Sequence, residues 1–560
     1  MKREKRILTA LVCCLAVMLL CGCTAAPAAT TIPTETTEPP RNLETGYIAT
    51  MDLEAAYCDA EGVVLGSFLR GTEVRYEAMP DGRLAICLED GDVYLSGDAA
   101  IVADPAEVIP AHTLYVRTAV NLRTAEGRLL PDFAEKGTAV QVTGCDYLYA
   151  DGQPHMYRVT LGDAVGYILP WYLTGTEAEA LANYDAGSYA THEKRTNRYG
   201  GGDAATLDYY PREKGPIAGN EMPAECRTLY LNSHCLDQVD AYLEIAANSG
   251  INAFVVDITD GSVMGYASNV MQSYCPSGAA AAKNTVEDYQ AAIRKLLDAG
   301  YYVIGRITTF NDSYFVQDHP EYAISDTEGN PLKLSRAYWP SPYCREAWQY
   351  KVDLAVEAVE LMGFNEIQFD YVRFPDNTRK YEKAGTVDFR NALGETKAQA
   401  VQRFLMYAAD ILHEHGAYVS ADVYGESAFT YVTAYGQYWP AISNVVDAIS
   451  GMPYPDHFDQ EGDRKPWEHP YDTLYNWGQC VAVRQTETAT PAAVRTWIQA
   501  YDAIRKPYNT YGPEEVAAQI KALRDTGCTG GYMTWNSKSS VEKYTALIPA
   551  FAPPEENNSN

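Results

Sequence analysis

The chain has 560 residues, enough for several domains, and its hydrophobic fraction of 47% is typical of globular proteins. A formal net charge of −30 at pH 7 excludes nucleic-acid binding through a general electrostatic surface. Of 13 cysteines, four lie within the first 23 residues and the others form no C-x-x-C pair, which argues against a zinc site and a dense disulfide framework.

Residues 1–23 predict an export signal. A basic start, MKREKR, is followed by an apolar stretch that is too short to span a bilayer comfortably. The stretch ends in Leu20-Cys21-Gly22-Cys23, which resembles the lipobox of bacterial lipoproteins. This resemblance implies that Cys23 is lipidated and anchors the protein to the extracytoplasmic face of the cell membrane. An ordinary secretory signal and a retained transmembrane anchor are the alternatives.

Residues 24–44 predict a disordered linker. The segment is rich in Thr, Pro and Ala and has few bulky apolar side chains, so it cannot bury enough surface to fold. The remainder of the chain is therefore expected to be tethered outside the membrane.

Residues 45–110 and 111–175 predict two small all-β modules, because short apolar runs alternate with Gly, Asp and Asn turns. A Gly-Thr pair at Gly71 returns at Gly137, which indicates an internal repeat of about 65 residues. The second copy, with VNLRTAEG, EKGTAVQVTG and GYI, resembles a bacterial SH3-like domain. The first copy departs from that pattern, so its assignment is weaker. The resemblance implies contact with cell-wall peptidoglycan; a plain spacer is the alternative.

After a linker at 176–226, residues 227–550 predict a (β/α)₈ TIM barrel, and 551–560 a disordered tail. Short apolar runs alternate with amphipathic segments, and glycines follow the predicted helices. A doubly wound sheet would need a Gly-rich loop after its first strand, which LNSHCL lacks. The predicted strands are 228–232, 253–258, 302–308, 366–372, 418–424, 446–454, 496–501 and 530–535. The predicted helices are 239–248, 286–298, 345–362, 397–415 and 513–526.

Polar residues recur at the predicted strand ends, where a barrel places its active site. The two carboxylates that we expect on adjacent strands are Asp370, in NEIQFDYVRFP, and Asp422. Such a pair can cleave a glycosidic bond across roughly 5–9.5 Å. A turn cap is the alternative for any one Asp. Arg373 could orient Asp370 by an ion pair, and Glu426 is a rival acid. The other expected substrate-binding residues are Asp257, Arg306, Tyr424, Tyr454, Gln499 and Trp535.

Five segments occur in a fixed order: VVDITDGSVMGY, VIGRITTFND, HPEYAISDTEGN, EIQFDYVRFP and SADVYG. Together they resemble the glycosyl-hydrolase-like domain family of unknown function, whose members are bacterial (β/α)₈ proteins, over about residues 228–544. The resemblance implies a carbohydrate substrate. It also implies that Asp370 and Asp422 are the catalytic carboxylates and that Asp257 and Arg306 are matching polar positions.

Other chemistries have no motif here. The chain lacks H-E-x-x-H, G-x-S-x-G, a P-loop and a dinucleotide fingerprint. Asp456, His457 and Asp459 could hold a metal ion, but their polar surroundings favour a solvated loop. We therefore predict no cofactor and no metal.

These observations predict a lipid-anchored, extracytoplasmic glycoside hydrolase that acts on a cell-surface or environmental polysaccharide. Asp370 would be the nucleophile or the stabiliser of an oxocarbenium ion, and Asp422 the general acid/base. Tyrosines and Trp535 would line the cleft. The alternatives are a non-catalytic glycan-binding lipoprotein and a scaffold of an envelope complex, and the spacing of Asp370 and Asp422 should distinguish them.

Overall fold

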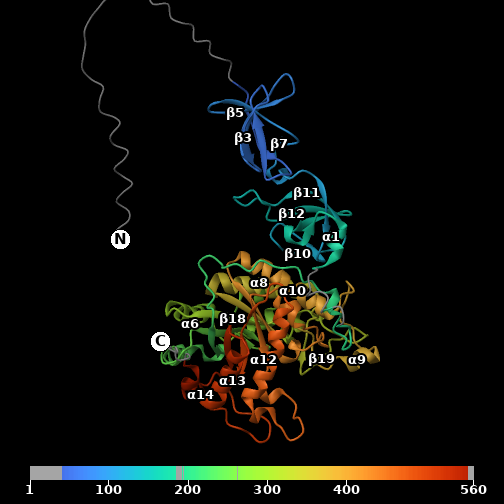
Figure 1. Ribbon diagram of the computed structural model, residues 1–560. Helices are drawn as coiled ribbons and strands as arrows, with labels where there is room; N and C mark the ends of the chain where they lie inside the picture. Colours follow the sequence, from blue (N-terminus) through green and yellow to red (C-terminus); the bar gives the residue numbers. More distant parts are fainter. Residues whose placement is uncertain (1–40, 185–191, 193–194, 262, 553–560) are drawn as a thin grey trace, which may run out of the picture.

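The computed structural model describes residues 41–184, 192, 195–261 and 263–552. The predicted signal peptide, Cys23, most of the first linker and most of the tail lie outside the described residues. Figure 1 shows two β modules stacked in line above a large α/β unit. Among the described residues, no helix is both long and apolar enough to cross a membrane, and all nine cysteines are free thiols.

The two β modules share one topology. Their antiparallel sheets run β3-β2-β6-β5-β4-β1-β7 and β10-β9-β13-β12-β11-β8-β14, the same order shifted by seven strands. The repeat in the sequence is therefore a repeat in structure, whereas its SH3-like identity stays a prediction. Gly71 and Gly137 occupy equivalent turns with φ of 78° and 86°, a left-handed conformation that favours glycine.

The strands of the first module are Glu44–Ala49 (β1), Glu54–Cys58 (β2), Val64–Leu69 (β3), Glu73–Ala78 (β4), Leu84–Leu88 (β5), Gly91–Leu95 (β6) and Ala100–Val102 (β7). Those of the second are His112–Val116 (β8), Val120–Arg123 (β9), Leu129–Ala134 (β10), Ala139–Cys145 (β11), Tyr157–Leu161 (β12), Ala164–Ile168 (β13) and Leu173–Thr174 (β14).

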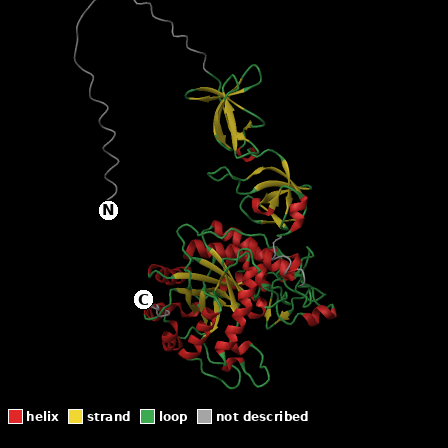
Figure 2. Cartoon of the chain, in the orientation of Figure 1, coloured by secondary structure: helices red, strands yellow, loops and turns green. Residues whose placement is uncertain are grey.

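The large unit is a nearly closed barrel of parallel strands surrounded by helices (Figure 2), which confirms the predicted barrel class. The sheet order is β24-β23-β22-β21-β18-β16-β15-β26-β25. The first and last strands of this order, β24 and β25, are separated in the chain only by Arg495. They are therefore two parts of one interrupted strand, and this strand brings the two edges of the sheet together. The strands are Cys226–Leu231 (β15), Ala253–Asp260 (β16), Tyr302–Thr308 (β18), Glu366–Asp370 (β21), Tyr418–Tyr424 (β22), Ala448–Met452 (β23), Ala493–Val494 (β24), Thr496–Gln499 (β25) and Gly531–Trp535 (β26).

The main helices of the barrel are Val239–Ala247 (α3), Val286–Asp298 (α6), Arg345–Met362 (α8), Lys397–Glu414 (α10), Pro470–Thr486 (α12), Pro513–Asp525 (α13) and Val541–Leu547 (α14). Shorter helices lie in the connections: Asn269–Tyr274 (α4), Pro276–Ala280 (α5), Ser313–Asp318 (α7), Arg379–Ala384 (α9) and Trp439–Ser443 (α11). Helix α1, Glu177–Ala182, lies in the segment predicted as the second linker.

Two differences from the predicted elements have physical causes. The strand predicted at 366–372 stops at Asp370, because Tyr371 has a left-handed φ of 50° that ends extended pairing. Helix α12 was not predicted, since a polar insertion precedes it. Its apolar Leu474, Trp477 and Val481 nevertheless recur at helical spacing and are buried.

The second β module is fastened to the barrel through a buried carboxylate on α10. Asp410 accepts a hydrogen bond from Arg123 of β9 at 2.6 Å. It also accepts bonds from Tyr172 and from Arg212, which lies in the segment between module and barrel. The two arginines hold the pKa of Asp410 below its usual range despite the burial that opposes this. Three parts of the chain therefore meet at one ionised group.

We expect Asp410→Ala to destabilise the protein by about 3–5 kcal/mol, because it leaves two buried guanidinium groups unpaired. Thermal unfolding measures the loss. Asp525→Ala, which removes an exposed i,i+4 partner of Lys521, is the control and should melt with the wild type. Equal melting of the Asp410 variant and the control would show that the module is held by other contacts.

Candidate active site

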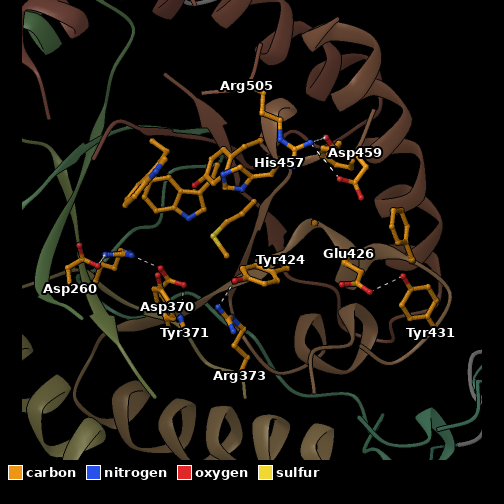
Figure 3. A pocket seen from close by; sticks show the side chains of 18 residues that line it. Asp260, Asp370, Tyr371, Arg373, Tyr424, Glu426, Tyr431, His457, Asp459 and Arg505 are labelled. Carbon is orange, nitrogen blue, oxygen red and sulfur yellow. Dashed lines mark hydrogen bonds and ion pairs between the residues drawn. The ribbon is translucent and has the colours of Figure 1, made fainter. Parts of the chain in front are cut away.

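A cleft of about 740 Å³ opens at the carboxyl ends of the barrel strands (Figure 3). Its floor and walls include the last residues of β16, β21, β22, β23 and β26. Aromatic rings dominate the lining, which suits stacking on flat apolar faces of a ligand. They are Tyr371, Tyr424, Phe429, Tyr431, Tyr454, Phe458, Trp497 and Trp535.

Asp370 lies on the floor of this cleft, with 8% of its side chain exposed. It is the last residue of β21, and the turn at Tyr371 directs the chain away immediately after it. Arg306 of β18 donates to Asp370 Oδ2, and the backbone N–H of Tyr371 donates to Oδ1 at 2.5 Å. Both oxygens are therefore held in place.

Arg306 connects four carboxylates. Its guanidinium is 2.6 Å from Asp257 Oδ1, 3.4 Å from Asp260 Oδ1 and 3.6 Å from Asp422 Oδ2, in addition to the contact with Asp370. The arginine is almost fully buried and its pKa is raised well above its ordinary value, because the surrounding carboxylates outweigh the effect of burial. One positive charge cannot neutralise four negative ones.

Two of these four groups bind protons more tightly than an ordinary Asp. Burial, with the charge of Asp260, raises the pKa of Asp257 to about 7 against the opposing effect of Arg306. Burial and then the charge of Asp370 raise the pKa of Asp422 well above its usual range. The cluster is therefore partly protonated near neutral pH.

The structure contradicts the expectation that Asp422 opens into the cleft opposite Asp370. Its side chain is fully buried and lies beneath the lining. Trp497 Nε1 donates a hydrogen bond to Asp422 Oδ1 at 2.7 Å, and Arg306 Nε lies 3.6 Å from the other carboxylate oxygen, Oδ2. Trp497 and Arg306 line the cleft themselves, so they separate Asp422 from any ligand there.

Arg373 does not form an ion pair with Asp370. It donates to the Tyr424 hydroxyl and, at 3.3 Å, to Asp376 Oδ1, and its guanidinium lies 4.2 Å from the centre of the Tyr424 ring. The orienting cation for Asp370 is Arg306 instead, because the turn at Tyr371 sends the following residues to another part of the wall (Figure 3).

Glu426 lies in the cleft wall beyond Tyr424 (Figure 3). Its two oxygens accept hydrogen bonds from the hydroxyls of Tyr431 at 3.0 Å and Tyr435 at 2.8 Å. The carboxylate is thus fixed by neutral donors, and among the described residues no cation is close enough to form an ion pair with it.

The remaining predicted residues divide between the cleft and the core. Tyr454 and Trp535 line the cleft. Gln499 is fully buried and does not line it; its side chain accepts from Asp456 N at 3.3 Å and donates to Tyr501 O at 3.2 Å, so it joins two loops.

The cleft also contains residues that the sequence analysis does not single out, among them Asp260 and Trp497. Asp260, 39% exposed, lies two residues beyond the strand predicted at 253–258, but a bulge in β16 lets that strand extend to it. Trp497 stands among the apolar residues of its strand, so its residue type alone does not indicate a place in the cleft. The alternation of side chains along a strand could have indicated it, because Trp497 lies two residues before Gln499 and therefore on the same face.

The three side chains at 456–459 do not form one cluster, although His457 Nε2 lies 3.9 Å from Asp456 Oδ1. Asp456 is buried and accepts from Tyr501 at 2.8 Å, whereas the side chain of Asp459 is 98% exposed beside Arg505. Within the described ranges, no group of three or more His, Cys, Asp or Glu side chains could hold a metal ion.

Comparison with known proteins adds a family. Residues 228–541, more than half of the chain, match the family described as "Putative glycosyl hydrolase domain". No curated protein matches the chain.

Similar solved structures include a hypothetical protein from Ruminiclostridium thermocellum (32% identity, TM-score 0.29, covering 35% of this chain and 97% of that one). The PgaB (BpsB) glycoside hydrolase domain from Bordetella bronchiseptica is 13% identical (TM-score 0.40, 58% and 99% covered). A class V chitinase from Pseudomonas fluorescens is 11% identical (TM-score 0.36, 58% and 99% covered). At these TM-scores, the structural similarities carry no argument about function.

The raised pKa of Asp257 predicts a pH-dependent stability. The native state holds this proton more tightly than the unfolded chain, where Asp has a pKa of about 3.9. The stabilisation is therefore complete below about pH 4 and is lost as the pH rises through about 7. We expect the melting temperature to fall between pH 5 and pH 8 by less in Asp257→Asn than in the wild type, as measured by scanning calorimetry.

The matched control for this measurement is Asp240→Asn, whose carboxylate is exposed on α3 and should leave the wild-type pH dependence unchanged. Parallel pH curves for the wild type and Asp257→Asn would contradict the assignment.

Proposed function

The chain belongs to the glycosyl hydrolase domain family that residues 228–541 match, and from that premise we propose that it hydrolyses O-glycosidic bonds of a cell-surface or environmental polysaccharide. The observation that carries the proposal is the position of Asp370. This carboxylate lies on the floor of an aromatic cleft at the carboxyl ends of the barrel strands, held by Arg306. Tyr424, Tyr454 and Trp535 would stack on sugar rings.

We propose that Asp370 acts at the anomeric carbon of the substrate, either as the nucleophile or as the group that stabilises an oxocarbenium ion. Its two oxygens are fixed by Arg306 and by the backbone of Tyr371, so it needs no rearrangement to present a defined face.

We assign the second carboxylate role to Asp260 rather than to the expected Asp422. Asp260 and Asp370 both line the cleft and both contact terminal nitrogens of the Arg306 guanidinium. Their contacting oxygens are therefore no more than about 8 Å apart. This bound is compatible with the separations of roughly 5–9.5 Å found in glycosidases. In this role Asp260 protonates the leaving oxygen.

Asp422 becomes a positioning residue. Burial raises its pKa, it lies beneath the floor, and it accepts a hydrogen bond from Trp497, which leaves Arg306 free to engage Asp370. Its proton does not reach the substrate in this arrangement, since Trp497 and Arg306 intervene.

The second candidate function is non-catalytic glycan binding by a lipoprotein. It is favoured by two observations: Arg306 engages Asp370 closely, and the expected partner Asp422 is buried. Saturable binding without turnover would distinguish it from hydrolysis.

We place the protein at the extracytoplasmic face of the cell membrane, anchored through lipidated Cys23. The motivation is the lipobox-like Leu20–Cys23 segment and the Thr/Pro-rich stretch after it. Two β modules between the tether and the barrel would hold the enzyme beside peptidoglycan.

A series of three amides tests the catalytic roles. On a glycan panel, we expect Asp370→Asn to lose about 10³-fold in kcat/KM and Asp260→Asn about 10²-fold. The Asp260 variant should recover on aryl glycosides, whose good leaving groups need little protonation. Asp422→Asn should stay within about tenfold, because a neutral amide can still accept from Trp497. An inactive Asp422→Asn beside an active Asp260→Asn would reverse the two assignments.

Lipidation is tested separately with Cys23→Ser in the full chain. Metabolic labelling with a fatty acid should mark the wild type and not the variant, and membrane fractionation should release the variant as a soluble protein. Undiminished labelling of Cys23→Ser would exclude this cysteine as the anchor.

A further inference from the structure

The cations of the cleft are already occupied by the protein itself. Arg306 engages four carboxylates, and Arg373 is held by Asp376 and Tyr424. Arg505, at the rim, lies 3.6 Å from Asp459 and donates to a backbone carbonyl at 2.9 Å. A carboxylate, sulfate or phosphate on a ligand would therefore compete with ion pairs that exist before it arrives.

Glu426, unlike these arginines, is held by tyrosine hydroxyls and not by an oppositely charged group. Each of its oxygens accepts one tyrosine hydroxyl, whereas an ionised carboxylate has about four acceptor sites. The remaining sites can take hydrogen bonds from a ligand in the cleft, and an ionised carboxylate offers no donor in return. The contacts of Tyr431 and Tyr435 fix its position without neutralising its charge.

The cleft around Glu426 contains further negative groups. Asp260 and Asp459 add two exposed carboxylates to the cleft, and the whole chain carries a formal charge of −30. A field of this sign lowers the local concentration of polyanions and slows their association.

We propose that the cleft selects a neutral or amino-bearing glycan over an acidic one, and that Glu426 is the specificity-determining residue. It accepts hydrogen bonds from hydroxyl or ammonium groups of a sugar next to the one over Asp370. This inference rests on the proposed function for its ligand class, but it concerns binding and does not require turnover.

The test uses the full chain with Asp370→Asn, so that hydrolysis does not deplete the probe. An oligosaccharide array with neutral, amino-bearing and uronic-acid members ranks the three classes, and calorimetry gives Kd for the tightest binder. We expect neutral or amino-bearing probes to bind and uronates not to bind. Adding Glu426→Gln should weaken binding roughly tenfold, because charge-assisted hydrogen bonds are lost.

Two controls isolate the role of Glu426. Asp240→Asn removes an exposed carboxylate on α3 that does not line the cleft, and Glu61→Gln removes one from the first β module. Both should change Kd less than twofold. Melting curves check that each variant is folded.

Three results would overturn the inference: preferred binding of uronates, no binding to any class, or an unchanged Kd in Glu426→Gln. A different result would contradict the proposed function. If the wild type binds a neutral or amino-bearing probe but does not hydrolyse it, and Glu426→Gln weakens that binding, the result supports this inference and excludes hydrolysis of the probe.

Discussion

The geometry of the cleft depends on one buried guanidinium. Arg306 lies among Asp257, Asp260, Asp370 and Asp422, and burying it without them would be prohibitively costly. The excess of carboxylates in turn forces some of them to retain a proton. The arrangement separates one orienting cation, one carboxylate held at the floor and, below it, one acid whose pKa burial raises. Removing the cation would leave those carboxylates to repel one another in a low-dielectric interior.

The same principle recurs elsewhere in the fold. Deeper in the barrel, Arg495 contacts both oxygens of Glu366 at 2.7 and 2.8 Å, and both side chains are fully buried. At the outer surface of the barrel, Asp410 joins two arginines from other parts of the chain. All described cysteines are free, so paired charges and apolar packing, rather than cross-links, hold these parts together.

Much of the architecture could be predicted because parallel barrel strands and amphipathic helices have strong periodicity. Strands 302–308 and 418–424 and helices 286–298 and 345–362 begin and end at the predicted residues. The candidate site was harder, because strand parity shows which residues face inward but not their depth. Asp370 and Asp422 both point inward, yet one reaches the cleft and the other stays beneath Trp497. That difference depends on long-range packing, which no local pattern records.

The stacked β modules have a mechanical consequence. Arg70 of the first module donates to the Gly152 carbonyl of the second at 3.0 and 3.1 Å, and the second is fixed to α10 through Asp410. These hydrogen bonds restrict rotation at both junctions. The two modules and the barrel would therefore move as one stiff body, which keeps a constant distance between Glu44, where the first module begins, and the cleft.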